Sequence, residues 1–110
     1  MTLRVKLLKS FFSKSIGLLG AKKAYPVYFT TRFGIHTFFL KFPIDVLVLD
    51  KNYIVVKLCE GLLPNRIFFW SPRFDTIIEL PSGEIRKRKI KCGEKIVIKA
   101  PIFLAESHQW

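Results

Sequence analysis

Short runs of β-branched and aromatic residues, separated by proline, glycine and other turn-forming residues, fill the chain from residue 35 to residue 99. Runs of this kind are typical of β-strands, and we predict strands over residues 35–41, 44–49, 53–59, 67–70, 75–80 and 95–99. The turn residues Asp50-Lys51-Asn52 separate the second run from the third and predict a hairpin. Tight turns between short strands favour antiparallel pairing.

The chain before this region is predicted to contain one strand and one helix. Residues 3–8 alternate apolar and cationic side chains, which is the period of a half-buried strand. Apolar residues then recur at helical spacing over residues 10–19, between a suitable N-cap, Ser10, and a suitable C-cap, Gly20, so a short helix is expected there. The alternative is one basic amphipathic helix over residues 3–19 lying on a membrane, and the alternation at its start argues against it.

These elements predict a mainly β (β-rich α+β) fold, either a curled antiparallel sheet or a small barrel, with one short N-terminal helix. The 110 residues are expected to form a single domain, 1–110, because this length is enough for one core. Half of the residues are hydrophobic and 11 are phenylalanine, which excludes intrinsic disorder. Residues 84–91 alternate poorly and are predicted to form a basic loop or an edge strand, where lysine would block unwanted pairing.

Positive charge is distributed unevenly along the chain. The net charge is +11, from 19 Lys and Arg against 8 Asp and Glu, and no carboxylate precedes Asp45. Such charge attracts polyanions, nucleic acid among them, and an ordinary solvated surface is the alternative interpretation. A second cationic run consists of Arg86, Lys87, Arg88, Lys89 and Lys91.

The two cysteines, Cys59 and Cys92, belong to no CxxC or Cys/His cluster, so no metal site is expected and both are predicted to be buried, reduced thiols. Lys9 and Lys14 interrupt the apolar residues near the N-terminus, so no secretory signal is predicted. No run approaches the roughly 20 apolar residues of a membrane span, and a cytoplasmic location is expected. The few side-chain amides and many cations are compatible with a hot habitat.

Residues 36–46 read H-T-F-F-L-K-F-P-I-D-V and resemble the segment H-T-F-G-M-R-F-P-I-D-V, which is typical of the domain-of-unknown-function family number 192. The elements G-L-L-G at 17–20, E-L-P-S-G at 79–83 and G-E at 93–94 follow the order of that family, so the resemblance covers about residues 3–99. The family has no agreed reaction or ligand, so the resemblance implies a fold and no activity. Lys41 stands where the family has arginine, and lysine lacks the planar fork that binds carboxylate or phosphate in two places.

The motif residues supply a candidate ligand pocket, lined by His36, Thr37, Lys41, Asp45 and Glu79. His36 and Asp45 have acid-base capacity, but no hydrolase, P-loop or dinucleotide motif is present, and no cofactor is expected. Three of these residues also have a structural alternative. Asp45 would accept backbone N–H bonds near Pro43 and pin a turn, His36 would be a packed core or rim residue, and Glu79 would form a structural ion pair.

Two functions therefore remain open at this point. The first is a ligand-binding module that takes an unknown small ligand in this pocket. The second is a polyanion-binding protein that binds single-stranded nucleic acid through residues 1–44 and the run of residues 86–91. Trp70 and Tyr53 are candidate stacking platforms for a sugar or base. A small enzyme is the third and least favoured hypothesis.

Overall fold

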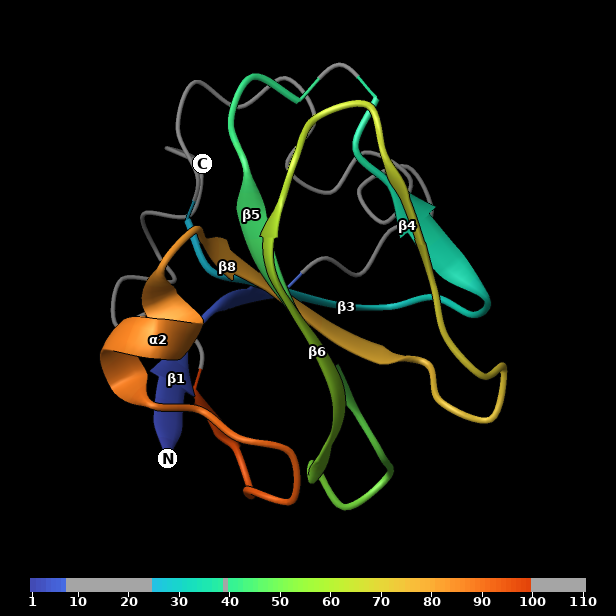
Figure 1. Ribbon diagram of the computed structural model, residues 1–110. Coiled ribbons are helices and arrows are strands. Elements are labelled where there is room, and N and C mark those ends of the chain that lie inside the picture. The colour runs from blue at the N-terminus through green and yellow to red at the C-terminus, as the bar shows by residue number, and fades with distance from the viewer. Residues whose placement is uncertain (8–24, 39, 100–110) are drawn as a thin grey trace.

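The computed structural model describes residues 1–7, 25–38 and 40–99 of the chain. At its centre lies a five-stranded sheet with the strand order β2-β3-β8-β5-β6 (Figure 1). β2 pairs with β3 in parallel, and the other neighbours pair antiparallel. The strands of this sheet are β2 (Lys6–Leu7), β3 (Val27–Thr30), β5 (Ile44–Leu49), β6 (Val55–Leu62) and β8 (Thr76–Pro81).

Within the ranges that the structure describes, two small sheets and one helix accompany the central sheet. β1 (Thr2–Arg4) pairs in parallel with β9 (Val97–Lys99), and β4 (Gly34–His36) pairs antiparallel with β7 (Ile67–Phe69). Only Val5 separates β1 from β2, and its N–H donates to the carbonyl of Lys99 at 2.9 Å, so one extended segment takes part in two sheets. The helix α2 (Glu84–Arg88) follows β8. Within the described residues, no helix is long and apolar enough to cross a membrane.

β5 lies between two hydrophobic clusters, because its side chains alternate between the two faces of the central sheet. Leu47 and Leu49 pack on one face with residues of β1, β8 and α2. Val46 and Val48 pack on the other face with residues of β3 and β8 and with Trp70. All six residues of β5 are buried, which explains why its sequence is continuously apolar apart from Asp45.

The predicted β-rich fold is confirmed, and so is the hairpin, in which β5 and β6 pair antiparallel. The strand predicted over residues 3–8 corresponds to β1 and β2 as far as the structure describes it. The helix predicted over residues 10–19 and the G-L-L-G element at 17–20 lie outside the described residues.

The strand predicted over residues 35–41 is wrong beyond His36, where β4 ends. Thr37 leaves the strand because its hydroxyl donates to the carbonyl of Leu63 at 2.6 Å and accepts from the N–H of Arg66 at 2.8 Å. The strand predicted over residues 95–99 forms in part, as β9, but it pairs with β1 and does not close the central sheet.

The loop or edge strand predicted over residues 84–91 is also wrong, because this segment contains α2. Ile85 and Ile90 are buried and anchor the helix and the turn after it in the cluster that contains Leu47. A helix this short has almost no stability of its own, so packing and capping decide its conformation. The cations of this run therefore do not protect a sheet edge.

Leu47→Ala is expected to lower the free energy of unfolding by about 2–5 kcal/mol, because Leu47 is fully buried on the central strand β5 and its truncation leaves a cavity. Urea denaturation followed by circular dichroism measures the change. Leu63→Ala is the matched control, since Leu63 is 52% exposed and its truncation should cost under about 1 kcal/mol. Equal losses for the two variants would contradict the position of β5 between the clusters.

Candidate functional site

One carboxylate joins three segments that are distant in the sequence. Asp45, on β5, is fully buried. Its Oδ1 accepts a hydrogen bond from the N–H of Gly61 on β6 at 2.8 Å. Its Oδ2 accepts hydrogen bonds from the N–H groups of Gly83 at 3.1 Å and Ile85 at 2.9 Å. Burying a carboxylate is costly unless it is hydrogen-bonded, and these three charge-assisted bonds offset that cost.

The backbone around Asp45 is shaped to present these donors. The pairing register between β5 and β6 shifts at Asp45, so that Glu60 and Gly61 both lie opposite it, and Gly61 has a φ of 62°. Gly83, with a φ of 96°, is the N-cap of α2 and has no side chain that could cap the helix. The Asp45 carboxylate therefore supplies the cap from another strand.

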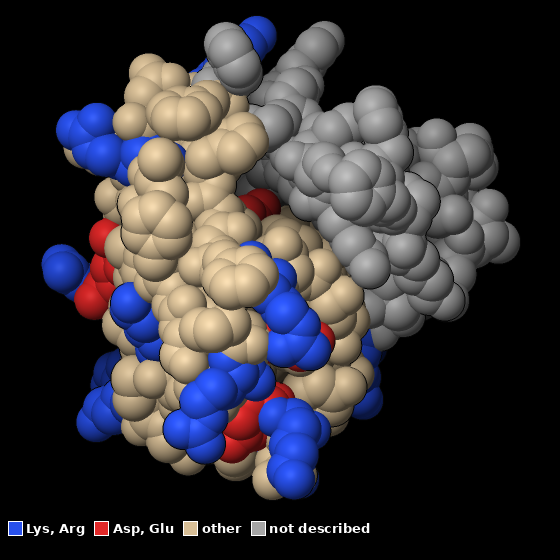
Figure 2. Space-filling view, turned by 90° about the vertical axis from the view of Figure 1, so that its right-hand side faces the viewer, with Lys and Arg blue, Asp and Glu red and all other residues tan. Residues whose placement is uncertain are grey.

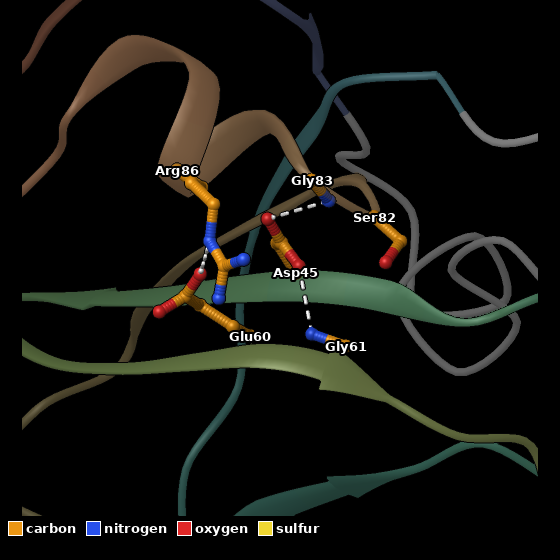
Figure 3. A pocket seen from close by; sticks show the side chains of 6 residues that line it. All are labelled: Asp45, Glu60, Gly61, Ser82, Gly83 and Arg86. Carbon is orange, nitrogen blue, oxygen red and sulfur yellow. Dashed lines mark hydrogen bonds and ion pairs between the residues drawn. The ribbon is translucent and has the colours of Figure 1, made fainter.

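A pocket of about 320 Å³ lies at this junction (Figure 3). Figure 3 shows Asp45 between Gly61 on β6 and the turn that precedes α2, with Arg86 reaching from the helix toward Glu60. Because Asp45 has no exposed surface, its role is to hold the backbone of the pocket walls in place. The lining residues are Asp45, Glu60, Gly61, Ser82, Gly83 and Arg86.

Three exposed polar side chains surround the mouth of the pocket: Glu60, Ser82 and Arg86. Arg86 Nε lies 3.7 Å from Glu60 Oε1, and the two side chains are 87% and 45% exposed. An ion pair this exposed contributes little to stability. The pocket thus offers a carboxylate, a guanidinium and a hydroxyl that can exchange their present partners for those of a ligand.

The carboxylates of this region also act on a neighbouring thiol. Burial raises the pKa of Cys59, and the charge of Asp45 raises that pKa further. Lys57 lowers it, and Glu60 raises it by a smaller amount. Both cysteines are free thiols. Cys59 is half-buried, whereas Cys92 is exposed, so the prediction of two buried thiols is wrong for Cys92.

The predicted pocket residues do not gather around Asp45. In the β5–β8 ladder, Asp45 lies opposite Leu80, whereas Val46 lies opposite Glu79. Because side chains alternate along a strand, Asp45 and Glu79 lie on opposite faces of the central sheet. Glu79 is buried there, and its charge adds to the effect of burial in raising the pKa of Tyr25.

The other three predicted residues also lie away from the pocket lining. Thr37 is fully buried and fixes the loop before β7 through the hydrogen bonds described above. The exposed ring of His36 stacks on Phe38 with 5.0 Å between the ring centroids, and Lys41 is exposed. Ligand binding by these residues stays a prediction.

The cationic run of residues 86–91 forms an exposed surface on α2 and the turn after it. Arg86 pairs with Glu60, and Arg88 pairs with Glu84 at 3.6 Å. The side chains of Lys87, Lys89 and Lys91 are exposed and form no ion pair with any carboxylate that the structure describes. No three His, Cys, Asp or Glu side chains in the described ranges are grouped as metal ligands.

Glu60 and Ser82 are absent from the predicted pocket, and Arg86 is predicted only as part of the cationic run. A signal for their position does exist in the sequence. Asp45 belongs to the motif at 36–46, and Ser82 and Gly83 belong to the E-L-P-S-G motif at 79–83. The hydrogen bond between Asp45 and Gly83 brings these two motifs together at one pocket.

Known proteins resemble this chain in sequence and in fold. A UPF0127 protein of Pyrococcus horikoshii is 37% identical over 98 residues, which cover 84% of this chain and 84% of that protein. No protein-family model matches the chain. A solved protein of unknown function from Novosphingobium aromaticivorans has a TM-score of 0.75 at 15% identity, covering 84% of this chain and 73% of that one. A Sinorhizobium meliloti protein proposed to be a transcription regulator has a TM-score of 0.72 at 17% identity, covering 83% and 78%.

Asp45→Asn is expected to lower the free energy of unfolding by about 2–4 kcal/mol, because an amide keeps one acceptor oxygen and turns an N–H₂ group toward backbone donors. Chemical denaturation measures the loss. Asp75→Asn is the matched control, since Asp75 forms an exposed pair with Arg32 that is worth at most about 1 kcal/mol. A loss at Asp45 no larger than at Asp75 would contradict the structural role of Asp45.

The two thiols are expected to react at different rates with a thiolate-specific reagent at about pH 8. Cys92 should react quickly because it is exposed, whereas Cys59 should react slowly because its raised pKa leaves less thiolate at that pH. The rate at Cys59 should keep rising with pH through the alkaline range, because its raised pKa delays formation of the thiolate. In Cys92→Ser the fast phase should disappear, and its persistence would show that Cys59 is the reactive thiol.

Proposed function

The chain belongs to the UPF0127 family, and we propose that it is a small ligand-binding module whose site is the pocket beside Asp45. The observation that carries this proposal is the buried carboxylate, which holds Gly61 and Gly83 as opposite walls of the pocket. A volume of about 320 Å³ lies within the range of small-molecule sites. We also propose that the chain is a member of family number 192, and the order of the motifs at 36–46 and 79–83 along the sequence supports this assignment.

The charges around the pocket favour a zwitterionic ligand. Glu60 can accept hydrogen bonds from an ammonium group, and Arg86 can donate two hydrogen bonds to a carboxylate. A molecule that carries both charges replaces the partner of each side chain and leaves neither charge unpaired. Ser82 can donate to or accept from a third group. The proposed ligand class is therefore a free amino acid or a similar small zwitterion.

Asp45 has a positioning role in this proposal. Its oxygens are fully buried and hold the backbone of both pocket walls, so the ligand would contact Glu60, Ser82 and Arg86. In this arrangement the residues that contact the ligand are different from the residue that stabilises the fold. Substitutions at the exposed groups should change ligand affinity with little effect on folding, whereas substitutions at Asp45 should change both.

The exposed lysines of the 86–91 run support a second candidate function, which is polyanion binding. Lys87, Lys89 and Lys91 can contact phosphates without first breaking an ion pair with a described carboxylate. The two functions differ in their response to salt. Neutralising several phosphates makes affinity fall steeply with ionic strength, whereas a zwitterion of zero net charge responds much less.

Isothermal titration calorimetry with three small probes tests the pocket proposal. L-serine carries both charges, ethanolamine lacks the carboxylate, and L-lactate lacks the ammonium group. L-serine is expected to bind at least about 10-fold more tightly than either of the others, because each of them leaves one charged hydrogen bond unmade. The absence of heat for all three probes would contradict the proposed ligand class.

Arg86→Ser and Arg88→Ser provide a matched pair of variants on one helix. Arg86→Ser should weaken L-serine binding by about 10-fold or more, whereas Arg88→Ser should leave it unchanged, because Arg88 pairs with Glu84 and does not line the pocket. Equal effects of the two substitutions would mean that general charge, and not the pocket, controls binding.

A further inference from the structure

The ribbon formed by β4 and β7 exposes an aromatic surface that is separate from the pocket lining. Ile67 and Phe69 point to the outer side of the ribbon, because Phe68 between them packs against the core. Ile67 is 52% exposed, and Phe33 and Phe69 are each 64% exposed. We call this surface the ribbon patch, and it consists of His36, Phe38, Ile67 and Phe69, with the exposed Phe33 directly before β4.

The rings of the ribbon patch are supported by backbone and by each other. Gly34 lies opposite Phe69, and a Cβ atom at Gly34 would lie only 2.6 Å from the carbonyl oxygen of Phe68 and 3.0 Å from Phe69 Cδ1. The Phe69 ring therefore lies directly against the backbone of β4. On the same side, His36 lies opposite Ile67 and stacks on Phe38 at an interplanar angle of 25°.

Three cationic residues adjoin the ribbon patch. Lys57 Nζ donates to the carbonyl of Phe69 at 2.7 Å, and Arg32 and Arg66 directly precede Phe33 and Ile67. The only ion pair between a described carboxylate and these cations joins Arg32 to Asp75 at 3.3 Å. Figure 2 views the molecule from the side on which β4 lies and shows uncharged surface bordered by Lys and Arg side chains, with some Asp and Glu side chains beside them.

We propose that the ribbon patch binds single-stranded nucleic acid. Unpaired bases have exposed flat faces that can stack on Phe33, Phe69 and the His36–Phe38 pair, while their phosphates reach the neighbouring cations. This combination of rings and cations is what sequence-independent binding of single strands requires. A duplex fits this surface less well, because its bases are already stacked inside the helix.

A second copy of the chain also fits the ribbon patch less well than a polyanion. Face-to-face association would bring Lys57, Arg66 and their neighbours against the same cations of the other copy, in a chain of net charge +11. The ribbon patch also differs from the stacking residues predicted from the sequence. Trp70 is buried, and its Nε1 donates a hydrogen bond to the carbonyl of Phe74 at 2.8 Å. Tyr53 lies before β6, directly before Ile54, which forms a β-bridge with Lys95, so it is not part of the β4–β7 ribbon.

Fluorescence anisotropy with a labelled oligothymidine of about 12 nucleotides tests this inference on the full chain. Affinity is expected to fall steeply between about 50 and 200 mM salt. Phe69→Ala is expected to weaken binding by about 5-fold or more, which is the smaller end of the effect of one stacked base. Arg66→Ser should weaken binding and also reduce the salt dependence.

Two control variants make the same kinds of substitution at positions outside the ribbon patch. Val97→Ala truncates an apolar side chain that is 44% exposed on β9, and Arg88→Ser removes a cation from α2. Both should leave oligothymidine affinity within about 2-fold of the wild type. Thermal melts of all four variants establish that each is folded, and L-serine binding should be unaffected by Phe69→Ala, so this test is independent of the pocket.

Several outcomes would overturn the inference. Equal affinity of Phe69→Ala and Val97→Ala would exclude stacking on the ribbon patch. Tighter binding of a duplex of the same length would indicate recognition of charge alone. A larger loss with Arg88→Ser than with Arg66→Ser would place the polyanion on α2. Self-association that depends on Phe69 without oligothymidine binding would identify a second copy of the chain as the occupant.

Discussion

A carboxylate can be buried in a β-sheet only where hydrogen-bond donors surround it, and Asp45 obtains three of them from the backbone. The donors belong to the bulge of β6 and to the turn that begins α2, which lie 16 to 40 residues away in the sequence. The position of α2 and the shape of the β6 bulge therefore depend on one side chain. A five-residue helix that has a glycine N-cap could not persist without such a cap and its buried isoleucine.

The same interaction explains why polar groups gather at one point of a strongly basic chain. Asp45 and Gly83 come from two different sequence motifs, and their hydrogen bond brings Ser82 and Arg86 across from Glu60. The exposed groups can then serve a ligand because the buried one already holds the backbone. The ribbon patch is built differently, from side chains that alternate along β7 and from a glycine that lets Phe69 lie on β4.

Sequence patterns predicted the parts of the fold that depend on periodicity. The β5–β6 hairpin was predictable because an apolar run meets strong turn residues at Asp50 to Asn52. The end of β4 was not predictable, because the Thr37 hydroxyl binds a loop 26 to 29 residues away and overrides the β-propensity of Phe38, which follows it. For Asp45, backbone hydrogen bonding was one of the predicted alternatives, but its partners lie far from Pro43. Glu79 and Asp45 lie on opposite faces of the central sheet because of the register between β5 and β8, and composition alone does not reveal that register.

Amide hydrogen exchange measured by NMR on the wild type and on Asp45→Asn tests the central claim most directly. If one carboxylate holds both pocket walls, the N–H groups of Gly61, Gly83 and Ile85 should lose protection together in the variant. The amide of Leu47 in the β5–β8 ladder should remain far better protected than these three. Loss of protection at only one of the three amides, or an equal loss throughout the described strands, would contradict the account.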